Sequence, residues 1–555
     1  MRATSLLLLT ALACTKAEET TPAVDPPRLT VDTPSGGSWV APGTMRVSGF
    51  ADGLTDVTID GEAVSLDGKR FEGAVQVAQG ISAFEVSGTD ANGDTVFERR
   101  SVIAGTFGPA GQRMDNVAVV QLTPEGLDQI LGIVPSLLDV DALVAQLQAA
   151  NPVTSGGFTG FSYNVNLDSL TLAPPAITLE LRDGVIGVTV VVDDFATAVT
   201  VYGDALLIPY DTTAGASVDR TTITFDLALA AGGGGVQASV GPVLLDLQGF
   251  HFDASLIPGS IEDQIPILSD AIRDFVVLTL QEQVAAVAPD LVHTFADALD
   301  LSFQTELLGR ELSVEAGIAS LKVDETGIRA GLDLGVRVRG AGDEPRYAGM
   351  FTLPKAPHHL PTDASIGVSL HDNLLNAILF EVWRSGLLEL TLSSEDEPLM
   401  GVLLQQLGAP AGSISVSAHL PPVAIEADGG LELQVGELDL RIDTPGGTYG
   451  DTVTLRLAGK IPLAPRIEGG ALGVELGTPE LSLMVVETDW RASYSTITNL
   501  LEDQLPISSL MAIAGAFSFP LPSFAGISVS EAIAIRAPSG VHTEIALDLA
   551  VGAAP

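Results

Sequence analysis

The chain has 555 residues and a formal net charge of −44, with 46% hydrophobic and 17% charged residues. A chain of this length exceeds what one hydrophobic core serves, so we expect several domains. Acidic residues outnumber basic ones by 70 to 26, and no cluster of Lys or Arg is present. This composition argues against nucleic acid as a partner and against electrostatic capture by anionic lipid. We interpret the acidity as a solubility feature.

The first 13 residues form a predicted export signal. Arg2, a short apolar run and small residues precede Cys14, the single cysteine, so no intrachain disulfide is possible. The segment resembles a bacterial lipoprotein signal, in which the cysteine becomes the acylated first residue. Ala11 stands where Leu is usual, and ordinary cleavage after 11–13 would instead leave Cys14 as a free thiol on a secreted protein. We expect acylation at Cys14, with 14–27 as a disordered tether and an outer-membrane lipoprotein facing the periplasm or the cell surface.

Residues 28–107 are predicted to form a small all-β sandwich. Short alternating runs are separated by turn dipeptides such as Asp52-Gly53, Asp60-Gly61 and Asn92-Gly93. The pattern Val57-x-Ile59-Asp60-Gly61 resembles bacterial immunoglobulin-like modules. Such modules usually act as spacers, and no site is assigned here.

The remainder of the chain contains an internal repeat. Residues 261–267 read Ile-Glu-Asp-Gln-Ile-Pro-Ile, and residues 501–507 read Leu-Glu-Asp-Gln-Leu-Pro-Ile. A second signature, Val120-x-Leu122, returns as Val368-x-Leu370, and an apolar helical pattern follows each copy. Such long-period similarity predicts a tandem duplication of a helix, sheet, helix, strand unit.

The first unit is predicted over 110–352. Its early helix, 123–149, has Thr123 as N-cap and Pro124 in the first position, and a late helix with an apolar stripe covers 260–288. Strand-like segments lie between them, from 177 to 252. Several of these segments are apolar at both odd and even positions, which predicts apolar surroundings, at least in part, on both faces of the sheet.

A Pro-rich linker, 353–362, precedes the second unit, predicted over 363–555. The second unit has an early helix over 370–388, strands such as 431–442 and 452–458, and a late helix over 493–514. The same order of elements thus occurs twice, in agreement with the repeated signatures.

The sequence contains no local signature of catalysis. It lacks a Gly-x-Ser-x-Gly elbow, a His-Glu-x-x-His helix and a phosphate-binding loop. The seven histidines are dispersed, and His358 and His359, adjacent in the Pro-rich linker, are expected to be solvent-exposed bystanders rather than metal ligands. We therefore predict no enzyme, no cofactor and no metal site.

Two tandem units joined by a Pro-rich linker resemble the bactericidal/permeability-increasing protein and lipid-transfer-protein family, which has a tubular lipid-binding fold. The closest stretch is 366–388, which resembles the opening helix of the family's C-terminal barrel. The resemblance implies an α+β fold with two tandem antiparallel β-barrel units, each with two long amphipathic helices, in a boomerang-shaped pseudo-dimer. The paired cysteines and the basic tip of animal members have no counterpart, so endotoxin binding is not carried over.

The physical chemistry favours lipid binding independently of the resemblance. A curved sheet covered by a helix leaves an apolar slot, and each buried methylene contributes roughly 0.8 kcal/mol, so a sixteen-carbon chain gains on the order of 12 kcal/mol before ordering costs. For each candidate pocket residue, ordinary core packing is the alternative role. The candidates are Ile130, Val134, Leu268, Ile272, Val276, Leu375, Leu379, Leu501 and Leu505.

The predicted function is a non-enzymatic, cell-envelope lipoprotein that binds, and in one version transfers, phospholipid or another acyl-chain lipid. Its expected partners are lipids and the membrane that holds its N-terminal anchor, and we expect a monomer. The alternative is a membrane-anchored adhesin or scaffold with solid units and no lipid cargo. A lipid hydrolase is disfavoured because the sequence shows no nucleophile signature.

Overall fold

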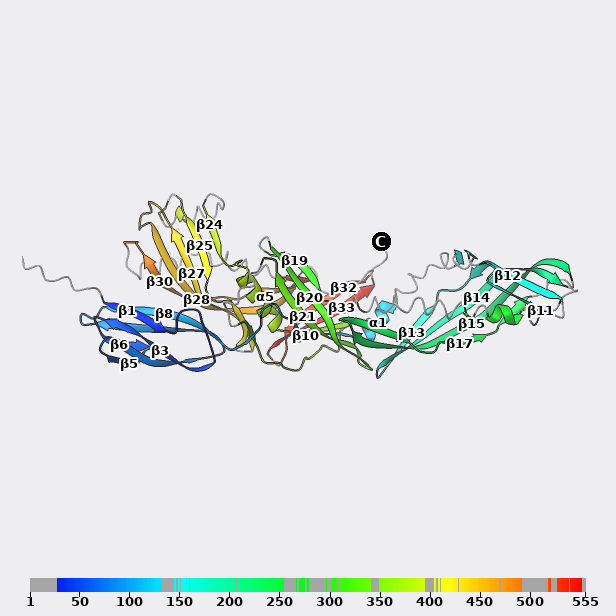
Figure 1. Cartoon of the computed structure of the whole chain (residues 1–555), viewed down its shortest axis with the longest axis horizontal. Coiled ribbons are helices and arrows are strands. Elements are labelled where there is room, and N and C mark those ends of the chain that lie inside the picture. The colour runs from blue at the N-terminus through cyan, green and yellow to red at the C-terminus, as the bar shows by residue number, and fades with distance from the viewer. Residues whose placement is uncertain are drawn as a thin grey trace, which may run out of the picture.

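A computed structural model describes the chain over 27–131, 151–253, 301–340, 349–394, 411–491, 518–520 and 527–551, apart from 159, 206, 308–309, 428, 469–470 and 539. It also describes short stretches within 144–149, 266–278 and 404–409, and residue 296. The molecule is elongated and mostly β (Figure 1). An N-terminal sheet lies at one end, a central sheet in the middle, and the long strands of the first unit form an arm at the other end.

The N-terminal part folds as one eight-stranded sheet in the order β1-β3-β6-β5-β4-β7-β8-β2. Its strands alternate between buried and exposed side chains, and Val47, Phe71 and Val86 are among the residues that fill its core. Its immunoglobulin-like character stays a prediction. The strands are β1 (Arg28–Thr33), β2 (Ser38–Val40), β3 (Gly43–Asp52), β4 (Leu54–Ile59), β5 (Glu62–Asp67), β6 (Arg70–Val77), β7 (Gly80–Asp90) and β8 (Thr95–Ala104).

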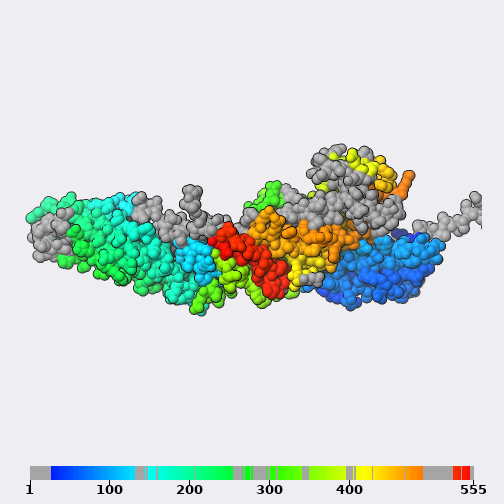
Figure 2. Space-filling model, turned by 180° about the vertical axis from the view of Figure 1, so that it is seen from behind, coloured from blue at the N-terminus to red at the C-terminus, as the bar shows by residue number. Residues whose placement is uncertain are grey.

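This N-terminal sheet packs directly against the second unit (Figure 2). The Ile81 amide donates a hydrogen bond to Oε1 of Gln434 at 2.7 Å, and the Ser101 amide donates to Oε1 of Glu437. Gly436 lies between these contacts, where a Cβ would come within 2.7 Å of the Ile81 side chain. Only glycine permits so close an approach. The sheet is therefore fixed to the second unit by buried contacts.

The central sheet contains strands from both units, in the order β19-β20-β21-β10-β23-β33-β32. Two short strands, β9 (Thr106–Gly108) and β22 (Met350–Thr352), pair with each other as a separate sheet. In the sequence they come directly before β10 and β23 of the central sheet. The first unit supplies β10 (Met114–Leu122), β19 (Phe303–Leu307), β20 (Arg310–Asp324) and β21 (Gly327–Val338), and the second unit supplies β23 (Ile366–His371), β32 (Ile527–Arg536) and β33 (His542–Val551).

A local two-fold axis passes through the middle of the central sheet. Strand β10 pairs antiparallel with β23, and Val120 lies opposite Val368. The sequence repeat makes the same two residues equivalent, since both stand first in the repeated signature. Leu122 lies opposite Ile366 on one side of the axis. The two units therefore meet through the same strand of each repeat, as an isologous interface does.

The first unit continues into a curled sheet with the order β11-β12-β14-β15-β16. Strand β14 (Val185–Ala205) is paired along its length with β15 (Ile208–Gly232), up to Ala228 of β15, and the two strands form the arm. Shorter strands line their two edges: β13 next to β14, and β17 and β18 next to β15. These are β11 (Thr154–Phe158), β12 (Phe161–Thr171), β13 (Ala176–Arg182), β16 (Gly235–Val240), β17 (Leu244–Gln248) and β18 (His251–Asp253).

The second unit repeats this strand order in β24-β25-β27-β28-β29-β31, with β26 next to β27 and β30 next to β28. In chain order, β24 to β30 correspond to β11 to β17. The strands are β24 (Leu390–Ser393), β25 (Ser413–Ala418), β26 (Val423–Ala427), β27 (Gly430–Asp443), β28 (Thr452–Glu468), β29 (Ala471–Leu476), β30 (Glu480–Thr488) and β31 (Ser518–Pro520).

Both curled sheets are open rather than closed, which corrects the prediction of β-barrels. The strand order of each described sheet begins and ends at an edge strand, and no ladder joins the two edges within the described residues. The sheets are half-barrels, whose apolar inner faces merge with the central sheet into one core.

Two long helices in each unit are not seen in the described residues. Helix α1 covers Pro124–Leu131, beginning at the predicted Pro124, and the Thr123 hydroxyl accepts from the Gly126 amide at 3.3 Å as an N-cap. Helix α5 covers Asn373–Arg384. It is shorter than the predicted 370–388 because β23 holds 366–371 in ladders on both sides. The predicted late helices, 260–288 and 493–514, lie outside the described residues, apart from stretches such as 269–274.

Helix α5 is fixed to the second half-barrel by hydrogen bonds from its buried face. The Asn376 amide side chain bonds to both backbone groups of Ala424, at 2.7 and 2.9 Å, and the Trp383 indole N–H donates to the Ala418 carbonyl at 2.6 Å. All four residues are buried. The helix is therefore bound to β25 and β26, at one edge of the half-barrel.

We expect Trp383→Phe to lower the free energy of unfolding by about 1–3 kcal/mol, because the Ala418 carbonyl loses its donor in a buried place. Trp490→Phe is the matched control. Among the described residues, the buried Nε1 of Trp490 has no hydrogen-bond partner, so the same truncation removes no bond there. Urea unfolding of both variants measures the difference, and equal losses would show that the indole bond contributes nothing.

Candidate functional site

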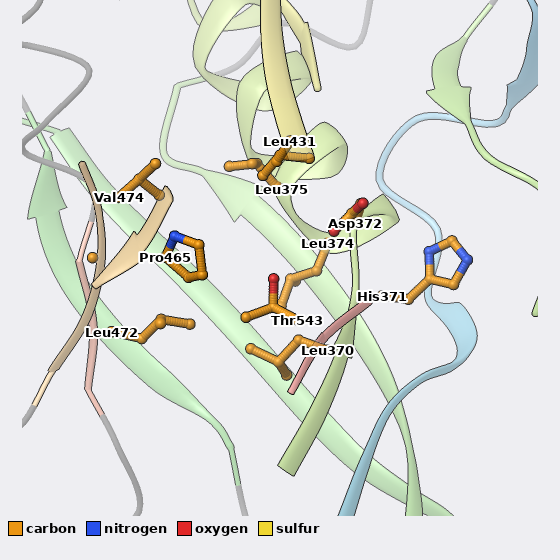
Figure 3. A pocket seen from close by; sticks show the side chains of 11 residues that line it. Leu370, His371, Asp372, Leu374, Leu375, Leu431, Pro465, Leu472, Val474 and Thr543 are labelled. Carbon is orange, nitrogen blue, oxygen red and sulfur yellow. The ribbon is translucent and has the colours of Figure 1, made fainter. Parts of the chain in front are cut away.

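A small apolar cavity lies between the first turn of α5 and the inner face of the second half-barrel (Figure 3). Its volume is about 50 Å³. The surrounding side chains come from α5, the central sheet and strands β27 to β29. They are Leu370, His371, Asp372, Leu374, Leu375, Leu431, Pro465, Leu472, Val474 and Thr543, together with the backbone of Gly473.

Strand alternation explains why these apolar residues meet. Leu472 and Val474 are two positions apart in β29, so their side chains point to the same face of the sheet. Pro465 of β28 lies opposite Val474, which places it in the same layer. Leu374 and Leu375 extend from the first turn of α5 toward this layer (Figure 3). In all, seven apolar side chains from five elements line the cavity.

A buried ion pair lies at the polar end of the cavity. Asp372, the residue before α5, accepts two hydrogen bonds from Arg536 of β32, at 2.7 and 2.8 Å. The side chains are 3% and 12% exposed, respectively. Arg536 also donates to the Thr543 hydroxyl, which lines the cavity, and to the Gly540 carbonyl. The guanidinium is thereby committed to groups of the protein and is not directed into the cavity.

Three histidines from distant parts of the sequence meet beside this ion pair. The His542 ring lies 4.4 Å from the His358 ring and 4.8 Å from the His371 ring, measured between centroids. His542 is 0% and His371 is 4% exposed. Burial lowers the pKa of all three, that of His542 to about 3, and the neighbouring His358, His371 and Arg536 lower it further. The cluster is therefore neutral at neutral pH.

Hydrogen bonds orient the two outer rings of this cluster. Nδ1 of His371 accepts from the Asn373 amide at 3.1 Å, so its proton is on Nε2, which donates to the Pro354 carbonyl. Nε2 of His358 bonds to the Asn116 carbonyl at 2.9 Å. His358 is thus a half-buried contact between the linker and β10, which corrects the expectation of an exposed bystander. The reason is that the linker folds back over the central sheet.

The first half-barrel carries an apolar inner face. Ile177, Val190, Ile223 and Leu245 stand in one row across β13, β14, β15 and β17, and Leu179, Val188 and Phe225 form the next row. The three large apolar side chains of β13, those of Ile177, Leu179 and Leu181, are half-buried. The other face carries Thr178, Thr189 and Thr224 in the corresponding row. Here the strands alternate, so the expectation of two apolar faces is wrong for this part of the sheet.

The predicted pocket residues fall into different places. Leu375 lines the cavity, whereas Ile130, Ile272 and Leu379 are buried in hydrophobic clusters, at 4%, 1% and 6% exposure. Their contact with lipid stays a prediction. The remaining candidates lie outside the described residues, as does the lipidation site: Val134, Leu268, Val276, Leu501, Leu505 and Cys14.

Sequence reasoning missed the strand residues of the cavity and the charged groups beside it. Alternation in 471–476 could have indicated that Leu472 and Val474 share a face. No local signal connects Asp372 with Arg536, which is 164 positions away, or His358 with His542. These pairs exist only because β23, β32 and β33 are neighbours in the central sheet.

A second hollow, of about 770 Å³, lies at the β19–β20 hairpin. Its described lining is polar and open to solvent, with Glu306, Arg310, Glu311 and Arg339 among its residues. Arg339 pairs with Glu311 at 3.0 Å, which leaves this charge satisfied. The hollow does not suit an acyl chain, and the smaller apolar cavity remains the candidate site.

Two other features are absent from the part of the chain that the structure describes. No group of three or more His, Cys, Asp or Glu side chains there has the arrangement to hold a metal ion. No helix in that part combines the length and the apolar character needed to cross a membrane.

No protein-family model and no curated protein matches this sequence. Among solved structures, a crystal structure of a lipopolysaccharide binding protein is similar, with 13% sequence identity and a TM-score of 0.41. The alignment covers 79% of this chain and 100% of that chain.

Proposed function

We propose that this protein binds the acyl chains of lipids against the apolar inner faces of its two half-barrels, as a carrier without enzymatic activity. The observation that carries the proposal is the cavity under α5. Its wall is formed by leucine, valine and proline side chains from the helix and from four strands. Such concave apolar sites are the common form of small-molecule binding sites.

The size of the cavity indicates how a lipid would occupy it. At about 50 Å³ it is far below the roughly 300 Å³ or more of a complete ligand site. It therefore receives the end of an acyl chain, while the rest of the chain lies along the half-barrel. The half-buried row on β13 offers the corresponding surface in the first unit.

The polar end of the cavity supports recognition of the chain rather than of a charged headgroup. Asp372 and His371 are the ionisable residues among its described lining, and Asp372 is already paired with Arg536. No Lys or Arg stands in the described lining to meet a phosphate. Affinity would then come from buried methylenes, at roughly 0.8 kcal/mol each.

The proposal includes a location in the cell envelope of a bacterium. The export signal and Cys14 support an acylated N-terminus on the outer membrane, with 14–27 as the tether. Transfer of lipid between membranes is a further step of the same proposal, for which the tether would hold the carrier at its donor or acceptor membrane.

We expect one or two lipids to copurify with each chain when the protein is prepared without detergent, as native mass spectrometry and lipid extraction would show. Val474→Trp should displace the lipid end from the second half-barrel, because the indole fills the cavity. Glu475→Trp is the matched control, since the next residue of β29 points to the opposite face and is exposed.

The outcomes separate the two functions considered. Lipid that is lost in Val474→Trp and retained in Glu475→Trp supports the carrier. A bare chain, still bare after incubation with envelope lipids, contradicts it and favours an anchored adhesin or scaffold.

A further inference from the structure

The far end of the arm presents an apolar tip, defined here as Leu207 and Ile208. They lie at the turn between β14 and β15, and their exposed fractions are 94% and 64%. This end is opposite the N-terminal sheet (Figure 1). In the part of the chain that the structure describes, neither side chain belongs to a hydrophobic cluster.

The backbone of the tip has an unusual conformation at Leu207. Leu207 has a φ of +71°, in the left-handed region that Gly and Asn adopt more readily than a large apolar residue. The strands stay paired up to the turn, with Ala205 opposite Ile208 and Asp204 opposite Pro209. A polar or small residue would be more stable at this position in water, so the leucine points to a use of its side chain outside the chain.

Aromatic residues lie directly behind the tip. The Tyr210 ring is stacked on Phe161, with centroids 5.9 Å apart, and Tyr163 lies 6.0 Å from Phe161. The Tyr210 hydroxyl donates to the Ser162 carbonyl at 2.9 Å, and burial raises its pKa to about 12, so the phenol stays neutral. Amphipathic aromatic rings behind an apolar end are typical of groups that lie at a membrane–water interface.

Charge and area indicate which partner fits the tip. Residues 154–171 and 195–219, which form this end of the arm, contain no Lys or Arg, and Asp204 and Asp211 flank the tip. An anionic membrane would repel this end, whereas a zwitterionic one would not. Two side chains also offer far less than the roughly 800 Å² per partner of a stable protein interface. Insertion into a bilayer needs no such area, because each apolar side chain gains on its own.

From these observations we infer that the apolar tip inserts into the surface of a zwitterionic lipid bilayer and places the arm end-on to the membrane. The inference concerns a docking surface and does not depend on lipid cargo in the half-barrels. Leu207 and Ile208 enter the acyl region of the bilayer, and the aromatic rings behind them, Tyr210, Phe161 and Tyr163, lie at headgroup level.

The test measures binding of the chain from position 14 onward, with Cys14→Ser so that no acyl anchor forms, to phosphatidylcholine vesicles by flotation. Leu207→Asn with Ile208→Thr removes the apolar tip while suiting the backbone, since Asn adopts a positive φ and Thr suits a strand. Ile533→Thr with Ile535→Thr is the matched control, because both isoleucines are about half exposed, at 51% and 53%, on β32 of the central sheet.

We expect the tip variant to bind the vesicles at least about tenfold more weakly than the parent, and the β32 variant to bind like the parent. Phosphatidylglycerol vesicles should bind the parent more weakly than phosphatidylcholine vesicles. Equal binding by both variants, no binding by the parent, or tighter binding to phosphatidylglycerol would each overturn the inference. Native mass spectrometry of the tip variant reports cargo separately, so a failed carrier and a failed docking surface are distinguishable.

Discussion

Asp372→Asn is expected to lower the free energy of unfolding by about 3–5 kcal/mol, because Arg536 is then left buried without its countercharge. The pair is among the most enclosed in the described chain, with side chains 3% and 12% exposed. It also joins the start of α5 to β32 across 164 residues, so its loss should loosen the helix from the central sheet.

Hydrogen exchange of α5 and β33, together with urea unfolding, would measure this effect. Asp443→Asn is the control: its partner Arg441 lies at 3.0 Å, but these side chains are 32% and 53% exposed, and such pairs contribute about 0–1 kcal/mol. In the double variant Asp372→Asn with Arg536→Gln, most of the loss should be recovered. A single-variant loss no larger than that of Asp443→Asn would show that water screens the pair.

Acid is expected to destabilise the protein through the histidine cluster, beginning below about pH 6.5. The folded-state pKa values of His358, His371 and His542 are lowered from 6.5, that of His542 to about 3. The unfolded chain therefore takes up protons that the folded chain refuses, and the free energy of unfolding falls as the pH decreases from 6.5 toward 3. For His542 alone the loss by pH 5 is about 2 kcal/mol.

The groups around the cluster set the sign of this effect. Arg536 and Lys355 are cationic neighbours that oppose protonation, and Asp372, which favours it for His371, is already paired with Arg536. His419 has the opposite behaviour, because its bond to Asp439 raises its pKa and adds stability below pH 6.5. The expected net change between pH 7 and pH 5 is a loss, since three histidines outweigh one.

Urea unfolding at pH 7, 6 and 5 would test the prediction in a range where most carboxylates stay ionised. His542→Gln should flatten the pH dependence, because the ring at the centre of the cluster can no longer be charged. His251→Gln, which removes an exposed histidine on β18, is the matched control. A steep acid loss that persists in His542→Gln would assign the effect to other groups.

The predictions from sequence agree with the structure where the local residue pattern and the tertiary contacts favour the same conformation. Thr123 and Pro124 begin a helix as their residue types predict, since capping satisfies backbone groups within one turn. The equivalent residues Val120 and Val368 lie opposite one another in the central sheet. The repeat itself does not specify this pairing, because either copy could have folded alone.

The predictions fail where a long-range contact outweighs the local pattern. Leu370 fits the apolar stripe of a helix, yet it belongs to β23, because β10 and β33 pair with both edges of that strand. The sequence predicts that His358 is an exposed linker residue, yet the fold of the linker places its ring against that of His542. Closure of a sheet into a barrel depends on its two edges meeting, which no single strand encodes.

By itself the sequence determined the predominance of β-strands, their turns, the duplication and the start of α1, since these depend on side-chain periodicity and backbone preference within a few residues. Only the tertiary structure decided the open half-barrels, the Asp372–Arg536 pair, the histidine cluster and the cavity under α5. Each of these brings together residues from strands far apart in the chain, and the free energy of such contacts exists only once the central sheet has formed.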